Sequence, residues 1–295
     1  MMMERGLSRL GIFFLYLISL LPFWFLYLIS EILFVVLYYI THYRRRVVQE
    51  NLRNSFPEKA EEERKIIEKK FFRYLADFIV ETIKTISISE QALRRRVIVT
   101  NPEMISDYYE KGRSVIVVGG HYCNWEFAGL GFQFYTDKKF MIVYKPLSNS
   151  VFDKFFLNIR SRFGTIPVSM KQTLRKMVEY KNELTTIAFL SDQTPVREDA
   201  VYFANFLHQP TAVFLGIEKL AKSMDKVVLY YDMRRIKRGY YTCTLTNLFA
   251  NPAQTVPYEI TEAHVKQLEL TIRKEPQYWL WSHRRWKFKP EDIQR

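Results

Sequence analysis

The sequence predicts an α/β protein in which a central mixed sheet is flanked by helices, preceded by an N-terminal hydrophobic membrane helix. Three observations support this prediction. The N-terminal region contains a long uncharged apolar run, short β-rich runs alternate with amphipathic segments beyond residue 114, and 48% of the 295 residues are hydrophobic. Strand–helix alternation is typical of a sheet covered by helices, and so much apolar surface excludes a disordered chain.

The first element is the apolar run from Leu10 to Ser30, which carries no charge and resumes shortly afterwards. As a helix, its 21 residues would span roughly 30 Å, the thickness of a hydrocarbon core. A buried core helix is the alternative, although such a helix is seldom apolar on all sides for so long. Pro22 predicts a kink, and both a kinked span and an in-plane hairpin fit the pattern. We expect a membrane anchor over residues 1–43 and one further domain over residues 44–295.

Charges flanking the apolar run predict its orientation. Arg44, Arg45 and Arg46 follow the run and outweigh Arg5 and Arg9 before it. Cytoplasmic flanks of membrane segments carry an excess of Lys and Arg, so we expect the body of the protein on the cytoplasmic side. The chain has only two cysteines, which excludes a disulfide framework and agrees with a reducing compartment.

The remaining elements follow from periodicity. Apolar positions three or four residues apart, opposite a charged face, predict a helix over residues 60–86. Beyond it, β-rich runs predict strands over 114–118, 140–144, 185–190, 227–232 and 241–246. Amphipathic segments predict helices over 124–135, 149–163, 171–182, 211–223 and 261–275. Neither a repeat nor a low-complexity linker interrupts this part of the sequence, which favours one domain.

The charge balance narrows the class of partner. The chain carries 44 Lys and Arg against 31 Asp and Glu, a formal net charge of +13. Such an excess suits a partner with phosphates or carboxylates, which includes nucleic acid, anionic lipid and acidic proteins. A basic surface that serves only solubility is the alternative.

The most informative stretch follows the strand predicted over 114–118, where two glycines precede His121 and Glu126. Across a strand-to-helix turn, with Glu126 in the first helical turn, the carboxylate can reach the imidazole. A carboxylate that accepts from one ring nitrogen fixes the tautomer and raises the basicity of the other, as in a general base. We expect the glycines to let backbone approach a ligand and the helix N-terminus to face an oxyanion. A structural histidine beside a solvated glutamate is the alternative.

Two other chemistries could use residues of this stretch: a cysteine nucleophile and a metal site. Cys123 raises the prospect of a Cys–His nucleophilic pair. However, Cys123 and His121 are two positions apart and seldom face each other, and a buried free cysteine is usually a small hydrophobe. The other histidines do not have the spacing of zinc ligands, so we expect no metal site.

Four features occur in order along the chain. They are the apolar N-terminal segment with RRVVQENLRNSFP at 45–57, His121-x4-Glu126 after Gly-Gly, Asp192-Gln193, and WSHRRWK at 281–287. Together they resemble the bacterial lipid A late acyltransferases (lauroyl or myristoyl acyltransferase family) over nearly the whole chain. That family belongs to a glycerolipid (lysophospholipid) acyltransferase-like group, which implies an α/β fold. The sequence departs from the family at Thr194-Pro195, where members often have a Gly-containing loop.

The resemblance implies an inner-membrane enzyme that moves a fatty acyl group from an acyl carrier protein thioester to a hydroxyl of a lipid A precursor. No metal or redox cofactor is implied. His121 would take the hydroxyl proton and Glu126 would orient His121. Arg160 and Lys145 correspond to basic substrate-binding positions, and Asp192 would orient Arg160 or bind a sugar hydroxyl. The acidic carrier protein would be attracted by the basic surface.

Two other functions are compatible with the same sequence. A related enzyme would act on another glycolipid or glycerophosphate acceptor, and a membrane-tethered polyanion-binding protein would carry an inactive site. Residues 281–287 interleave Trp with Arg and Lys, which fits an interfacial anchor or a polyanion patch. We expect membrane phosphates rather than nucleic acid as the partner, because the sequence contains no recognisable nucleic-acid module. A turn-capping Asp192 and a solvated Arg160 are the structural alternatives.

Overall fold

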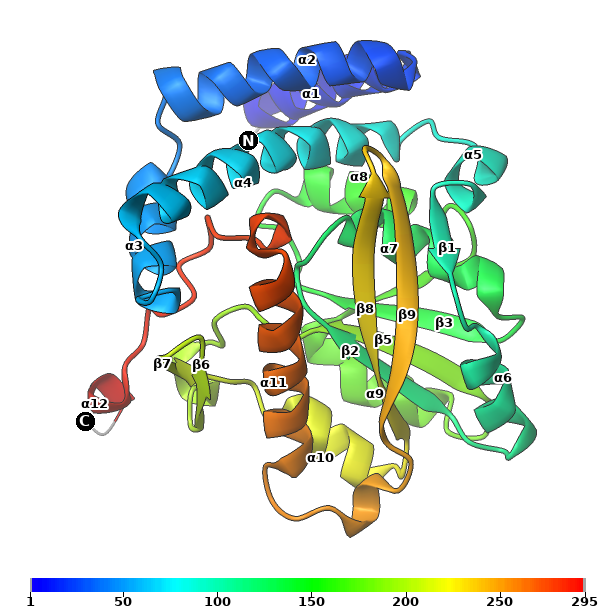
Figure 1. Ribbon diagram of the computed structural model, residues 1–295. Coiled ribbons are helices and arrows are strands. Elements are labelled where there is room, and N and C mark those ends of the chain that lie inside the picture. Colours follow the sequence, from blue (N-terminus) through cyan, green and yellow to red (C-terminus); the bar gives the residue numbers. More distant parts are fainter. Residues whose placement is uncertain (1, 294–295) are drawn as a thin grey trace.

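The computed structural model describes residues 2–293, with side chains over residues 6–292. Its centre is a seven-stranded sheet in the order β1-β9-β8-β2-β5-β3-β4 (Figure 1). The strands are β1 Val97–Val99, β2 Val115–Gly119, β3 Lys139–Tyr144, β4 Ile166–Ser169, β5 Thr185–Leu190, β8 Val227–Lys237 and β9 Tyr240–Phe249. Neighbours from β8 to β4 are parallel, whereas β9 is antiparallel to β8. The predicted α/β fold with a mixed sheet is confirmed.

Helices cover the sheet on both faces. The α-helices of the described chain are α1 Met2–Leu20, α2 Phe23–Val35 with its π-helical extension η1 Val36–Ile40, α3 Arg45–Ser55, α4 Glu61–Lys84, α5 Glu90–Arg94, α6 Glu103–Glu110, α7 Trp125–Gly131, α8 Ser150–Arg160, α9 Thr173–Glu179, α10 Gly216–Ser223, α11 Glu259–Lys274 and α12 Pro290–Ile293. In Figure 1, α11 lies in front of the sheet, α7, α8 and α9 lie behind it, and α4 crosses above its upper edge.

The five predicted strands are all present, and β8 and β9 are longer than expected. The sequence pattern missed β1 and β4, which have only three and four residues. It also missed a separate ribbon formed by β6 (Phe203–Phe206) and β7 (Gln209–Ala212). The helix expected over 211–223 is therefore wrong at its start. Thr211 pairs with Ala204 in this ribbon, and α10 begins only at Gly216.

Strand β2 positions the candidate site residues. All five of its residues are buried, as is typical of a parallel strand covered on both faces. It pairs in parallel with β5, and Gly119 at its end stands opposite Leu190. Because the two strands run in the same direction, the segments that follow them emerge side by side at one edge of the sheet.

The N-terminal segment consists of two helices rather than one kinked helix. Helix α1 ends at Leu20, and α2 begins at Phe23, directly after Pro22. Both lie above α4 in Figure 1. Among the described helices, the segment Phe23–Ile40 alone is long and apolar enough to cross a membrane, with a mean hydropathy of 2.0 over its 18 residues.

Candidate active site

His121 and Asp192 meet at the edge where β2 and β5 end. Nδ1 of His121 lies 2.6 Å from Oδ1 of Asp192, and the backbone N–H of His121 donates to Oδ2 at 2.8 Å. Nε1 of Trp279 donates to the same Oδ2 at 2.7 Å. One buried carboxylate is therefore surrounded by three donors, which hold it in a fixed position.

These contacts keep Asp192 ionised. Burial opposes its charge, but the imidazole of His121 and the hydrogen bonds from His121 and Trp279 outweigh burial and lower its pKa to about 2. An ionised carboxylate can only accept, so Nδ1 of His121 carries the proton. On the other side of the ring, the amide of Gln193 donates to Nε2 at 3.1 Å. His121 is thus held in the tautomer whose Nε2 is the accepting nitrogen, and the Gln193 amide is the donor that Nε2 accepts from in this structure.

The expected contact between His121 and Glu126 is wrong. Glu126 does lie in the first turn of α7, but its carboxylate accepts from Nε and Nη2 of Arg160 at 3.2 and 2.6 Å. The ring of Trp125 faces the imidazole instead, edge-on at a centroid distance of 5.0 Å. Successive residues of a helix point about 100° apart, so Trp125 and Glu126 cannot both face His121.

Arg160 and Lys145 occupy different surroundings. Arg160 ends α8 and is largely enclosed. Burial opposes its charge, but the Glu126 carboxylate more than compensates, so its pKa is raised. Lys145 follows β3 directly and is exposed. Asp192 binds His121 and Trp279, so the expected pairing of Asp192 with Arg160 is not the one found.

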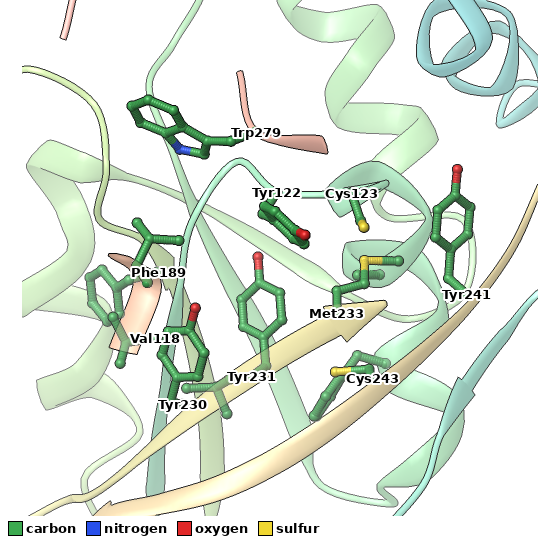
Figure 2. Packing of buried hydrophobic residues seen from close by; sticks show 14 of the residues in the cluster. Val118, Tyr122, Cys123, Phe189, Tyr230, Tyr231, Met233, Tyr241, Cys243 and Trp279 are labelled. Carbon is green, nitrogen blue, oxygen red and sulfur yellow. The ribbon is translucent and has the colours of Figure 1, made fainter. Parts of the chain in front are cut away.

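Cys123 points away from the edge of the sheet where β2 and β5 end. It is fully buried, and Figure 2 shows its sulfur directed into the cluster that contains Met233 and Tyr231. Burial raises the pKa of the Cys123 thiol well above its ordinary value. A protonated thiol inside the core is not an available nucleophile, which disfavours the Cys–His pair.

The two glycines before His121 serve packing rather than ligand approach. A Cβ on Gly119 would collide with the ring of Tyr231. A Cβ on Gly120 would lie 2.8 Å from Leu268 and 3.0 Å from the Asp192 carboxylate. The phenol of Tyr231 also donates to the carbonyl of Gly120 at 2.9 Å. The glycines therefore let β8 and α11 close tightly under the site.

Residues 279–285 form one side of the site, which we call the C-terminal wall. Tyr122 and Trp279 form an isolated antiparallel bridge, and the N–H of Leu280 donates to the carbonyl of His121 at 3.2 Å. Trp279 and Trp281 are among the largest fully buried side chains, and Arg285 is only 3% exposed. The interfacial patch expected at 281–287 is wrong for these residues, because this part of the segment is core.

Helix α3 holds this wall in place. The amide of Asn51 donates to the carbonyls of Trp281 and His283 at 2.8 and 3.0 Å. The ring of Phe56 lies 5.7 Å from that of Trp281. The sequence did not predict the roles of Asn51, Gln193 and Trp279. Asn51 and Gln193 belong to motifs that the sequence singled out, at 45–57 and 192–193, whereas Trp279 lies just before the motif at 281–287.

The arrangement can transfer a proton at Nε2 of His121. Within the described part of the chain, no group of three or more His, Cys, Asp or Glu side chains is arranged to hold a metal ion. The neighbouring Glu126–Arg160 pair contributes a partly accessible guanidinium. An imidazole supported by an anion suits a reaction that activates a hydroxyl, and a guanidinium suits a phosphorylated or carboxylated substrate.

Comparison with known proteins identifies the family of this chain. Residues 1–288 match the sequence profile of the family described as bacterial lipid A biosynthesis acyltransferase. The lipid A biosynthesis lauroyltransferase of Escherichia coli (strain K12) is 25% identical over 290 residues, covering 97% of this chain and 93% of that protein. A lipid A biosynthesis acyltransferase of Haemophilus influenzae is 23% identical over 277 residues, with coverages of 92% and 85%.

The lipid A biosynthesis palmitoleoyltransferase of Escherichia coli (strain K12) is 24% identical over 253 residues, covering 84% of this chain and 80% of that protein. The two Escherichia coli relatives differ in the acyl group that their names specify. What they share with this chain is the reaction class and nearly the full length. With the profile extending over residues 1–288, the chain belongs to the bacterial lipid A biosynthesis acyltransferase family.

Proposed function

We propose that the protein transfers a fatty acyl group from an acyl carrier protein thioester to a hydroxyl of a lipid A precursor. The observation that carries the proposal is the buried, ionised Asp192 bound to Nδ1 of His121, which leaves Nε2 as a base. Membership of the family supplies the reaction class.

In the proposed mechanism, His121 is the catalytic base. Its Nε2 takes the proton from the acceptor hydroxyl as the oxygen attacks the thioester carbonyl carbon. The C–S bond then breaks, and the carrier thiolate receives the proton from the imidazolium. No covalent acyl-enzyme forms. Asp192 is a positioning residue: it fixes the tautomer of His121 and stabilises the imidazolium.

The Glu126–Arg160 pair is assigned to the acceptor side of the site. Arg160 is held through two hydrogen bonds to the Glu126 carboxylate, which fixes the plane of its guanidinium. A fixed guanidinium binds a lipid phosphate through its remaining N–H groups, and the exposed Lys145 adds positive charge at the carboxyl end of β3. Glu126 thereby contributes to catalysis through Arg160 rather than through His121.

The proposed location is the cytoplasmic side of the bacterial inner membrane. The apolar segment Phe23–Ile40 supports membrane attachment. The arginines that follow it, Arg44 to Arg46, favour the cytoplasmic face, whose anionic lipids attract basic segments next to a membrane anchor.

The test uses the purified full chain in detergent with acyl-loaded carrier protein and a lipid A precursor that has a free 3-hydroxyacyl hydroxyl. Mass spectrometry of the lipid should show the mass gain of one acyl group. We expect His121→Ala to lower turnover by ~10²–10⁴-fold, the usual cost of losing a general base. Asp192→Asn should lower turnover and shift the acid limb of the pH–rate profile, with donor binding retained.

Controls and contrary outcomes separate the alternatives. His208→Asn and Asp107→Asn change the same residue types at exposed positions and should leave turnover unchanged. Transfer to a glycerophosphate acceptor but not to the lipid A precursor would contradict the proposed acceptor. Full turnover by His121→Ala would remove the proposed mechanism, and lipid binding without turnover by the wild-type chain would indicate an inactive site.

A further inference from the structure

We infer that α1 and the α2–η1 helix lie in the plane of one membrane leaflet, with their exposed apolar face among the acyl chains, and do not cross the bilayer. Length and hydropathy alone would allow a crossing, because the 18 residues of Phe23–Ile40 span roughly 27 Å as a helix. The contacts of this segment decide against it.

One face of the α2–η1 helix is an exposed apolar stripe. Its members recur every three or four residues and are between 44% and 66% exposed: Trp24, Leu28, Ile32, Val35 and Tyr39. Helix α1 adds a second set of exposed apolar side chains: Leu7, Leu10, Phe14, Leu17 and Leu20. Exposed apolar side chains in such number on two helices mark an interaction site. We call these ten residues the apolar stripe.

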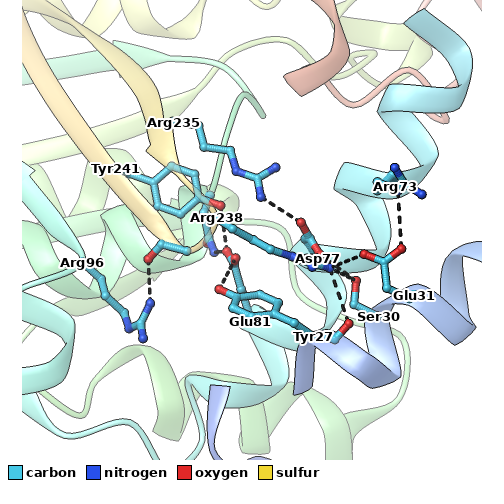
Figure 3. Close-up of polar contacts among 12 residues, drawn as sticks. Tyr27, Ser30, Glu31, Arg73, Asp77, Glu81, Arg96, Arg235, Arg238 and Tyr241 are labelled. Carbon is cyan, nitrogen blue, oxygen red and sulfur yellow. Dashed lines mark hydrogen bonds and ion pairs between the residues drawn. The ribbon is translucent and has the colours of Figure 1, made fainter. Parts of the chain in front are cut away.

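The opposite face of α2 packs against the rest of the protein. Leu26, Phe34 and Tyr38 are buried, on a helix that packs lengthwise along α4. Ser30 on the same face donates to the buried carboxylate of Asp77 at 2.7 Å, and the phenol of Tyr27 donates to Glu81 at 3.0 Å. Figure 3 shows these contacts between α2 and α4.

Charged groups lie at the middle of the segment. Glu31 is at the centre of Phe23–Ile40, and its carboxylate pairs with Arg238 at 2.9 Å and with Arg73 at 3.5 Å. Arg235 binds the adjacent Asp77 at 2.8 Å. If the segment crossed the bilayer, this whole network would lie at the hydrocarbon centre, where charged side chains are most costly. In the plane of one leaflet, the network faces the headgroups and water.

Both ends of the segment are tied to α4, so it cannot tilt away. Near its start, Nζ of Lys84 donates to the carbonyls of Ser19 and Leu21 at 2.7 and 2.9 Å. Just beyond its end, Nε of Arg45 donates to Glu68 at 2.7 Å. Lys84 and Glu68 lie 16 positions apart on α4, so the segment is held alongside α4 over its whole length.

The occupant of the apolar stripe is therefore the acyl region of one leaflet. Positive charge supports an anionic leaflet: Lys69 and Arg73 project from α4 over the rings of Tyr39 and Phe34, and the chain carries a net charge of +13. Under the proposed function, this orientation also has a consequence for the acceptor. Phe78 of α4 packs on Trp125, which contacts His121, so a lipid would reach the base from the side of this leaflet.

The first experiment measures depth. Variants of the full chain with one added exposed cysteine, Trp24→Cys, Ile32→Cys or Tyr39→Cys, are labelled with an environment-sensitive fluorophore and reconstituted into anionic phospholipid vesicles. Cys123 and Cys243 are buried, so the wild-type chain serves as the unlabelled control. Quencher lipids at several depths should place all three labels at one depth, within about 5 Å. A crossing helix would separate the outer two, 15 residues apart, by ~22 Å, which would overturn the inference.

The second experiment measures partitioning with matched variants. The double variant Leu28→Asp/Ile32→Asp changes the apolar stripe, and Val201→Asp/Val256→Asp changes two equally exposed apolar residues elsewhere. We expect the first to weaken vesicle binding by roughly tenfold per substitution, with the thermal midpoint in detergent unchanged, and the second to have no effect. Equal binding by both variants, or a dimer that buries the stripe in place of vesicle binding, would overturn the inference. Neither readout depends on acyl transfer.

Discussion

His264 and His208 show how strongly the surroundings of one residue type differ within this fold. His264 is 1% exposed on α11, and burial together with the nearby Arg285 lowers its pKa to about 4. His208 lies in the β6–β7 turn with its side chain half exposed. A histidine held neutral by burial makes stability depend on pH.

This contrast predicts acid sensitivity. Below the ordinary histidine pKa near 6.5, the unfolded chain binds a proton that folded His264 excludes until pH falls to about 4. The free energy of unfolding therefore falls as pH drops from 6.5 to 4, by about 2 kcal/mol at pH 5 for this residue. We expect His264→Gln to lose correspondingly less stability than wild type between pH 7 and pH 5. Urea titration in detergent at both pH values measures this.

The matched control for this prediction is His208→Asn, which should keep the acid sensitivity of the wild-type chain. Asn also tolerates the positive φ of 64° at that position. Identical pH dependence in wild type and His264→Gln would show that the neutral state of His264 contributes nothing to stability.

At the scale of elements, α3 and the C-terminal segment act together. The two are far apart in sequence, yet Asn51 spans them with two hydrogen bonds, and Arg44 donates to the carbonyl of Ser282 at 3.0 Å. The segment in turn presents Trp279 to Asp192. A substitution in α3 that removes these hydrogen bonds is therefore expected to shift the backbone of the C-terminal wall and, with it, the position of Trp279 at the site.

We expect Asn51→Ala to lower the free energy of unfolding by about 1–3 kcal/mol, because a buried carbonyl and a partly buried one lose their donor. Turnover should also fall, since Trp279 is less firmly held. Asn54→Ala, on the exposed face of the same helix, should change neither quantity. Thermal unfolding in detergent and the acyl-transfer assay measure both. An Asn51→Ala variant with wild-type midpoint and turnover would contradict the proposed support of the wall.

At the scale of the whole molecule, the net charge of +13 bears on the encounter with the donor. A basic surface accelerates association with an acidic protein, and salt screens the attraction. With acyl carrier protein as the donor, we expect kcat/KM to fall as ionic strength rises from 0.05 to 0.5 M (about a threefold change in screening length). Initial rates at fixed acceptor concentration measure this.

The control donor is an acyl-pantetheine thioester, which has the same reacting group without the acidic protein. Its kcat/KM should change little with salt. An equal salt dependence for both donors would place the effect on the lipid acceptor or on membrane binding, and would contradict electrostatic steering of the carrier.

The sequence by itself determined the class of the protein and the identity of most of its elements. Alternating periodicity predicted the five central strands and their covering helices, because local spacing decides which face of an element is apolar. His121 and Asp192 were both singled out from motifs. The apolar N-terminal run was equally evident, because hydropathy is a property of composition.

Only the tertiary structure decided which of these residues meet. Asp192 rather than Glu126 binds His121, because β2 and β5 are neighbours in the sheet and the first turn of α7 directs Glu126 toward Arg160. Likewise, the N-terminal apolar segment is held alongside α4 by Asp77 and Lys84, partners more than 40 residues away. Such pairings depend on strand order and helix packing, and these arise from contacts across the whole chain that no local pattern contains.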